Sequence, residues 1–281
     1  MDTKVVVLII ISLLVGLVIG YAISLPEKQA LQTKIANLEN KLNPNYVQKI
    51  KSRGKLVVGT SADWPPFEYI DKNGNFAGID IEIAKKIAQA LGVQLEIKDM
   101  KFAALIESLK NGQVDLIIAD ITPKPEREQQ IDFSIPYYSS KGYAVLVLKD
   151  SGIKTVEDLY GKKIGVQLGT IQEDWAKNNL GEKSEIKSYD RVYPDMVMVL
   201  KRGDVDALIV GDTIGEVLAN RDPQLQLAFY AGHAATGGAV GMPQGAEDLK
   251  FVVNKVIYNM LESGEMENLF HTEVEKWLIK G

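Results

Sequence analysis

Two loop segments, each directly after an expected strand, carry side chains suited to holding a small polar molecule. Residues 60–69 read TSADWPPFEY, in which Trp64 on a proline-stiffened loop offers a rigid, flat wall. Residues 120–127 read DITPKPER, in which Thr122 is placed to cap a helix and Arg127 to grip a carboxylate with paired hydrogen bonds. An aromatic ring packed under a loop and an ordinary helix cap explain these residues equally well, so their weight comes from their position after strands.

The composition disfavours several other kinds of chemistry. The 281 residues contain no Cys and only two His, His233 and His271. Cysteine nucleophiles, thiolate or imidazole metal sites and serine triads are therefore hard to assemble. The 32 Lys and Arg against 37 Asp and Glu give a formal charge of −5, without the positive excess that binding to a nucleic-acid backbone requires. Hydrolytic enzymes and nucleic-acid partners are accordingly disfavoured.

The elements that would position the two loops alternate between strand and helix. Apolar runs and their spacing predict strands at 55–59, 93–97 and 114–119, a helix at 80–91 with an acidic N-cap and a stop at Gly92, and a helix at 102–110. This alternation predicts an α/β fold with mostly parallel strands.

An internal repeat predicts two similar lobes. Residues 109–118 (LKNGQVDLII) and 200–209 (LKRGDVDALI) agree at six of ten positions, and an aspartate follows each, Asp120 or Asp212. In open α/β sheets, ligands bind beyond the carboxyl ends of the strands. The loops that carry Trp64 and Arg127 are therefore expected at a cleft between the lobes.

The N-terminal residues 5–25 contain no charged side chain and are long enough to cross about 30 Å of bilayer as a helix. They predict a membrane anchor. A cleavable signal peptide is the alternative, because residues 22–24 (AIS) form a small-x-small triplet after the minimally positive Lys4. Leu31, Ile35, Leu38 and Leu42 then form one apolar stripe over residues 26–45, which predicts a helical stalk. Either alternative places the rest of the chain outside the cytoplasm.

Three motifs in order resemble the extracytoplasmic amino-acid-binding proteins of ABC importers. They are GTSADWPPFEYIDKNGNFAGIDIEIA, DLIIADITPKPEREQQIDFSIPYY and TVEDLYGKKIGVQLGTIQED. The resemblance covers nearly all of residues 46–281 and implies the two-lobed, periplasmic-binding-protein-like type II fold. In that fold a discontinuous first lobe (residues 46–143 and 237–281) holds an inserted second lobe (residues 144–236), and the chain would cross near residues 142–148 and 235–242.

The resemblance also implies roles for single residues. Trp64 matches the aromatic ring that covers the ligand, and Thr122 with Arg127 matches the groups that hold its α-carboxylate. The other ligand positions implied are Phe102 as a second wall, Gln167 in the side-chain pocket, Thr170 and Gln172 from the second lobe, and Ser61 and Asp120, which replace a frequent Asp and a common Gly or Ser.

The α-ammonium position matches less well. Asp212 is the nearest counterpart of the family's ammonium-binding aspartate, but it lies one residue late, and a gapless alignment puts Gly211 there. A one-residue bulge at the strand end would restore Asp212 to the site. Nearby carboxylates at Asp63, Glu68 and Asp120 would favour a cationic side chain such as arginine or lysine over glutamate, unless they are solvated or bound to backbone N–H groups.

We therefore expect an extracytoplasmic receptor that binds a free polar or basic amino acid by lobe closure. It would deliver the ligand to the permease subunits of an ABC transporter, without a metal or cofactor and without enzymatic activity. The N-terminal helix would hold it at the membrane. The alternative is a cyclohexadienyl dehydratase on the same fold, with Asp120 or Glu173 as the acid.

Overall fold

The computed structural model describes residues 25–42, 45–233 and 236–280. The chain divides into two compact units, the first ending at Asn45 and the second beginning at Tyr46. The first unit contains helix α2 (Leu25–Leu42), which spans most of the segment predicted as a stalk. The predicted anchor lies outside the described residues, apart from Leu25. Among the helices that are described, none is long and apolar enough to cross a membrane.

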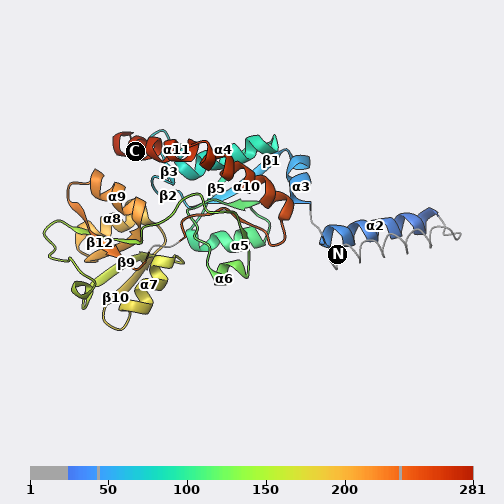
Figure 1. Ribbon diagram of the computed structural model, residues 1–281. Coiled ribbons are helices and arrows are strands. Elements are labelled where there is room, and N and C mark those ends of the chain that lie inside the picture. The colour runs from blue at the N-terminus through green and yellow to red at the C-terminus, as the bar shows by residue number, and fades with distance from the viewer. Residues whose placement is uncertain (1–24, 43–44, 234–235, 281) are drawn as a thin grey trace. The chain divides into compact units, whose positions relative to one another are not determined.

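The second unit contains two five-stranded sheets (Figure 1). The first has the order β5-β1-β6-β13-β7. Its strands are β1 (Lys55–Thr60), β5 (Gln94–Asp99), β6 (Leu116–Ile117), β7 (Asp132–Phe133) and β13 (Gly241–Met242). We call this sheet and the elements packed on it the first lobe. They include helices α3 (Tyr46–Arg53), α4 (Ile79–Leu91), α5 (Leu105–Lys110), α6 (Pro125–Glu128), α10 (Glu247–Glu262) and α11 (Glu265–Lys280), and the short strands β2 (Asp63–Trp64), β3 (Glu68–Ile70) and β4 (Phe76–Ala77).

The second sheet has the order β10-β9-β11-β8-β12 and forms the second lobe. Its strands are β8 (Tyr143–Leu148), β9 (Lys163–Gln167), β10 (Glu185–Tyr189), β11 (Ala207–Gly211) and β12 (Leu225–Ala231). Its helices are α7 (Ile171–Leu180), α8 (Val197–Arg202) and α9 (Asp212–Arg221), with short helical turns at Glu157–Leu159 and Val192–Met196; a third such turn, Phe102–Ala104, precedes α5 in the first lobe. Figure 1 shows the helices of this lobe gathered around β9, β10 and β12.

Each sheet mixes strand directions. β1 runs parallel to β5 and β6, and β9 runs parallel to β10 and β11, as the repeat predicts. The other pairings are antiparallel, because β8 and β13, the strands next to the chain's passages between the sheets, run against their neighbours. The prediction of mostly parallel strands is therefore right for only half of the pairings in these two sheets, and the small third sheet, β2-β3-β4, is wholly antiparallel.

Two predicted helix caps are wrong. Gly78, not an acidic residue, is the N-cap of α4, and Asp80 lies fully buried inside its first turn. Lys124, not Thr122, precedes α6, which places Pro125 at a position where the missing N–H costs nothing. The predicted stop of α4 is correct, because Gly92 adopts the left-handed conformation with φ 71°. Neither Asp80 nor Thr122 therefore caps a helix.

Candidate ligand-binding site

A cavity lies between the two lobes, beyond the ends of β1, β6, β9 and β11. Its lining comes from Ser61, Trp64, Glu68, Phe102, Ala119, Asp120, Thr122, Arg127, Tyr138, Ser140, Gln167, Thr170, Ile171, Gln172 and Gly211. All predicted ligand residues except Asp212 are in this set. The strand ends predicted to face a cleft therefore bring the predicted side chains together.

Arg127 places a buried positive charge at one side of the cavity. It is 4% exposed, and burial lowers the pKa of its guanidinium to about 10. Nη1 donates to the carbonyl oxygen of Thr122 (2.6 Å), and Nη2 donates across the lobes to that of Gly169 (2.9 Å). The Phe102 ring lies against the guanidinium, 5.4 Å from its carbon. Arg127 forms no ion pair with any described residue, and its direct hydrogen-bond partners are two neutral carbonyl groups.

Two carboxyl groups also line the cavity: Glu68 is fully buried, and Asp120 is partly buried with its Oδ1 shielded from solvent. Neither oxygen of Glu68 accepts an N–H or O–H from any described residue, although the Asp80 carboxyl lies close enough to share a proton with it. Asp120 accepts from Trp64 Nε1 at Oδ2 (2.9 Å), its Oδ1 accepts no hydrogen bond from the described residues, and the Tyr138 hydroxyl lies close enough to the carboxyl to lower its pKa. Burial, followed by the charge of Asp80, raises the pKa of both groups well above the usual range. Both carboxyls are therefore short of cationic partners.

The end of β11 differs from the expectation for Asp212. β11 pairs with β8 in regular register from Ala207 to Gly211, so the bulge that would have restored Asp212 is absent. Gly211 lines the cavity instead. The carboxylate of Asp212 accepts the backbone N–H groups of Lys141 (2.5 Å) and Thr213 (2.8 Å).

The second lobe contributes the start of α7. Thr170 is its N-cap, with Oγ1 accepting from the Glu173 N–H (3.1 Å). Although burial acts to raise it, the pKa of Glu173 is lowered overall by hydrogen bonds from Lys177, Ser188 and the Gly169 N–H. Glu173 is therefore ionised and committed to structure, which removes it as a candidate acid. Gln172 and Ile171 complete this wall.

Comparison with known proteins identifies the family. Residues 56–278 match the model of the bacterial extracellular solute-binding proteins, family 3. The chain belongs to this family. It is 40% identical over 218 residues to the arginine-binding extracellular protein ArtP of Bacillus subtilis, covering 76% of this chain and 84% of that protein.

Solved structures of the same fold agree. The amino acid ABC transporter substrate-binding protein AbpA of Streptococcus pneumoniae, bound to L-arginine, is 35% identical with a TM-score of 0.78, covering 83% of this chain and all of that one. The ancestral amino acid-binding protein AncCDT-1, a precursor of cyclohexadienyl dehydratase, is 31% identical with a TM-score of 0.74, covering 83% and 99%. This member of family 3 thus has the two-lobed α/β architecture that its sequence predicts.

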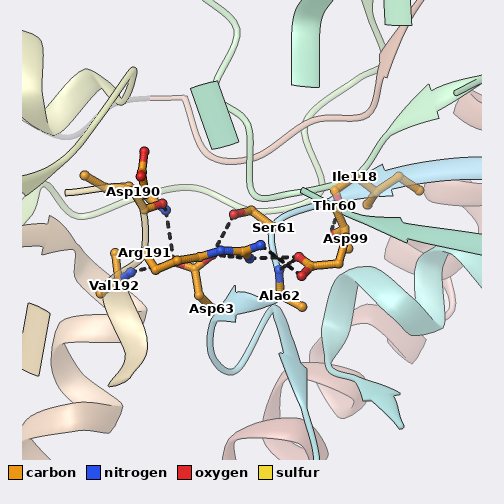
Figure 2. A network of polar contacts seen from close by, with 10 residues as sticks. Thr60, Ser61, Ala62, Asp63, Asp99, Ile118, Asp190, Arg191 and Val192 are labelled. Atoms are coloured by element: carbon orange, nitrogen blue, oxygen red, sulfur yellow. Dashed lines mark hydrogen bonds and ion pairs between the residues drawn. The ribbon is translucent and has the colours of Figure 1, made fainter. Parts of the chain in front are cut away.

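A second polar cluster joins the lobes beside the cavity (Figure 2). Asp63 accepts from Ser61 Oγ (2.6 Å) in its own lobe, and from Gln167 Nε2 (3.0 Å) and the Val192 N–H (2.5 Å) in the other. Arg191 of the second lobe donates both terminal nitrogens to Asp99 (2.8 and 2.9 Å) and approaches Asp63 at 3.3 Å. We call Asp63, Asp99, Arg191 and the Val192 N–H the interlobe latch.

The latch and part of the cavity escaped sequence reasoning. The sequence predicts Asp63 among the carboxylates near the ligand, but Asp63 does not line the cavity. Gln167, which is predicted in the side-chain pocket, lines the cavity, but its amide Nε2 donates to Asp63 of the latch. Tyr138 and Ser140 were missed because they lie on an irregular segment after β7, where no periodicity marks them. Arg191 follows the end of β10, so the rule that singles out residues after strands would have found it.

Proposed function

We propose that this family member is an extracytoplasmic receptor for a cationic L-amino acid, with arginine as its preferred ligand, serving an ABC importer. One observation carries the proposal. The same cavity holds the buried guanidinium of Arg127, without an ion-pair partner among the described residues, and the carboxyl groups of Glu68 and Asp120, without a cationic one. A molecule with one carboxylate and two cationic groups complements all three.

The complementarity has a physical cost behind it. A buried charge without a partner loses its hydration, and a carboxyl group in that position takes up a proton instead. The raised pKa values of Glu68 and Asp120 reflect this cost. Charged hydrogen bonds from a guanidinium or ammonium group would restore the ionised carboxylates, and Arg127 would receive the ligand's α-carboxylate in the same step. Glutamate would add a negative charge to an acidic wall.

Delivery fits a two-lobed receptor. Contacts from both lobes line the cavity, so a ligand that touches both favours the closed form only through its higher affinity for that form. The arginine-binding relative and the arginine-bound neighbour support the choice of ligand. We also propose that residues 5–25 anchor the receptor to the membrane, on the strength of their uncharged composition.

The dehydratase alternative has weaker support. Of its two candidate acids, Glu173 is ionised by its hydrogen bonds, which leaves Asp120 alone with a raised pKa. Its Oδ2 is already occupied by the Trp64 N–H. Incubation with prephenate or arogenate and measurement of product absorbance would separate the two functions, and we expect no turnover.

A thermal-shift screen of the protein amino acids tests the ligand. At about 100 times Kd, a true ligand adds about 2.7 kcal/mol to the free energy of unfolding, enough for a clear shift. We expect arginine to give the largest shift and to compete best against labelled arginine, ahead of lysine and glutamine. Tightest binding by glutamate would refute a cavity that selects cationic ligands.

A membrane-sedimentation assay tests the anchor. The full chain should sediment with membranes, whereas a chain beginning at Tyr46 should not.

A further inference from the structure

We infer that Asp120, on the first lobe, receives the α-ammonium group of the bound amino acid, leaving Glu68 for the cationic side chain. The inference rests on the proposed function and deepens it, because it divides two similar carboxyl groups between two different cations. Among the residues that line the cavity, Glu68 and Asp120 are the only acidic ones in the described chain.

The position of Arg127 separates the two carboxyls. The ammonium and carboxylate groups of an amino acid share one carbon, so the acceptor of the first must lie near the donor to the second. The charge of Asp120 acts on the Arg127 guanidinium and, against the larger effect of burial, raises its pKa. The chain makes the same connection, since Arg127 Nη1 donates to the carbonyl of Thr122, two residues after Asp120. Asp120 is therefore at the α-carbon end of the cavity.

Among the described residues, the second lobe places no carboxylate in the lining of the cavity. Asp212 spends its oxygens on the N–H groups of Lys141 and Thr213. At Gly211, an added Cβ would lie 3.0 Å from Cζ2 of Trp64, tighter than nearly all such contacts. Trp64 is in turn fixed by its hydrogen bond to Asp120. The Trp64 ring that fills the space over Gly211 is thus held by Asp120, the same carboxylate that receives the ammonium group.

The backbone of Asp120 is built to hold that position. Its φ of 44° lies in the left-handed region, a backbone conformation that residues other than glycine rarely adopt. Its N–H donates to Oδ2 of the buried Asp80 (2.7 Å), which also accepts from the Tyr137 hydroxyl (3.1 Å). A Cβ at Gly238 would come within 2.6 Å of Asp120 Oδ1, so glycine there leaves that oxygen its space. Asp80 and Gly238 are therefore positioning residues for the Asp120 carboxylate.

A ligand-and-protein double-mutant cycle tests the division. The probes are L-arginine, 5-guanidinopentanoate, which lacks the α-ammonium group, and L-citrulline, whose side chain is neutral. Their Kd values are measured by calorimetry on the wild-type protein, Asp120→Asn and Glu68→Gln. In Asp120→Asn we expect arginine to bind at least about 30-fold more weakly and 5-guanidinopentanoate to change little. In Glu68→Gln the preference over 5-guanidinopentanoate should survive, and the preference over citrulline should collapse.

The outcomes separate this inference from the function beneath it. Equal losses for arginine and 5-guanidinopentanoate in Asp120→Asn would overturn the ammonium assignment while leaving an arginine receptor. Failure of the wild-type protein to bind arginine would overturn the function and the assignment together. Asp120→Ser repeats the cycle if the Asn variant does not fold. Gly211→Asp should weaken arginine binding because its side chain meets Trp64, and a gain in affinity would contradict the assignment.

Discussion

The cavity and the interlobe latch both bury carboxylates between the same two lobes, yet they treat charge in opposite ways. In the latch, both oxygens of Asp63 and both of Asp99 accept from N–H or O–H groups. In the cavity, neither oxygen of Glu68 accepts a hydrogen bond from an N–H or O–H group of the described residues, and neither does Oδ1 of Asp120. The chain therefore supplies its own closing contacts at the latch and leaves those in the cavity to a ligand.

This difference divides the work of closure. In the proposed closure mechanism, the latch favours the closed form whether or not an amino acid is bound, and the ligand adds its own preference for that form. A stronger latch would raise the affinity for every ligand alike, whereas the cavity decides which ligand binds. Substitutions in the two regions should consequently change different measurements.

The largest expected effect is at Arg127 in the cavity. Arg127→Ala should cost about 2–5 kcal/mol of arginine binding, because the ligand carboxylate then lies buried without its partner. Arg127→Lys should rescue little, since a point charge cannot reproduce the paired donors. Calorimetry measures both. Normal affinity in Arg127→Ala would remove Arg127 from the site.

The pH dependence should separate the cavity from the fold that surrounds it. Arginine requires Glu68 and Asp120 ionised, and both have raised pKa values, so binding releases protons and affinity should rise with pH by up to about 1.4 kcal/mol per unit for each proton released.

Stability without added amino acid should change in the opposite direction. Burial raises the pKa of Asp63 and of Asp80 to about 6, so the folded chain holds protons that the unfolded chain releases. The free energy of unfolding should therefore fall as the pH rises from about 4 to above 6. Calorimetric affinity and thermal melting, each measured from about pH 4 to about pH 8, check the two signs. Affinity that falls with pH would contradict ionised carboxylates in the complex.

Glu68→Gln in the cavity should change the free energy of unfolding in the opposite direction to a matched substitution in the latch. The wild-type folded state must keep a buried carboxyl protonated near pH 7, and the neutral amide avoids that cost. We expect the unliganded protein to gain about 1–2 kcal/mol of stability while arginine binding weakens. Asp63→Asn is the matched variant in the latch, and it should lose stability because an amide nitrogen cannot accept the hydrogen bonds that one of the two Asp63 oxygens now accepts. Chemical denaturation of both variants tests the opposite signs.

Local patterns predict the two lobes and part of the cavity, and the family resemblance implies further residues of its lining. Apolar runs place Trp64 and Thr122 after strand ends, whereas Gln167 and Thr170 are implied by the resemblance alone. The contacts of Asp80 and Arg191 could not be predicted in this way. Their partners lie 40 residues or more away in the chain, and neither the helical nor the strand period carries information about such pairs. The absent bulge at Gly211 likewise depends on regular pairing with β8, a strand far earlier in the chain.

The smallest expected effect is at the latch. Arg191→Met removes the ion pairs to Asp99 and Asp63 but keeps a long apolar stem, and because the Arg191 side chain is 25% exposed the loss should be about 1 kcal/mol. The affinities for arginine and lysine should fall by the same factor, mainly through faster release, because Arg191 does not line the cavity. Lys101→Met is the matched control: its pair with Asp190 also joins the lobes, but at 62% and 46% exposure it should contribute little. Stopped-flow release and small-angle scattering report the two consequences, faster dissociation and a larger radius of gyration without ligand. A change in the preference between arginine and lysine would show that the latch reaches into the cavity, and equal behaviour of the two variants would show that burial at Asp63 adds nothing to closure.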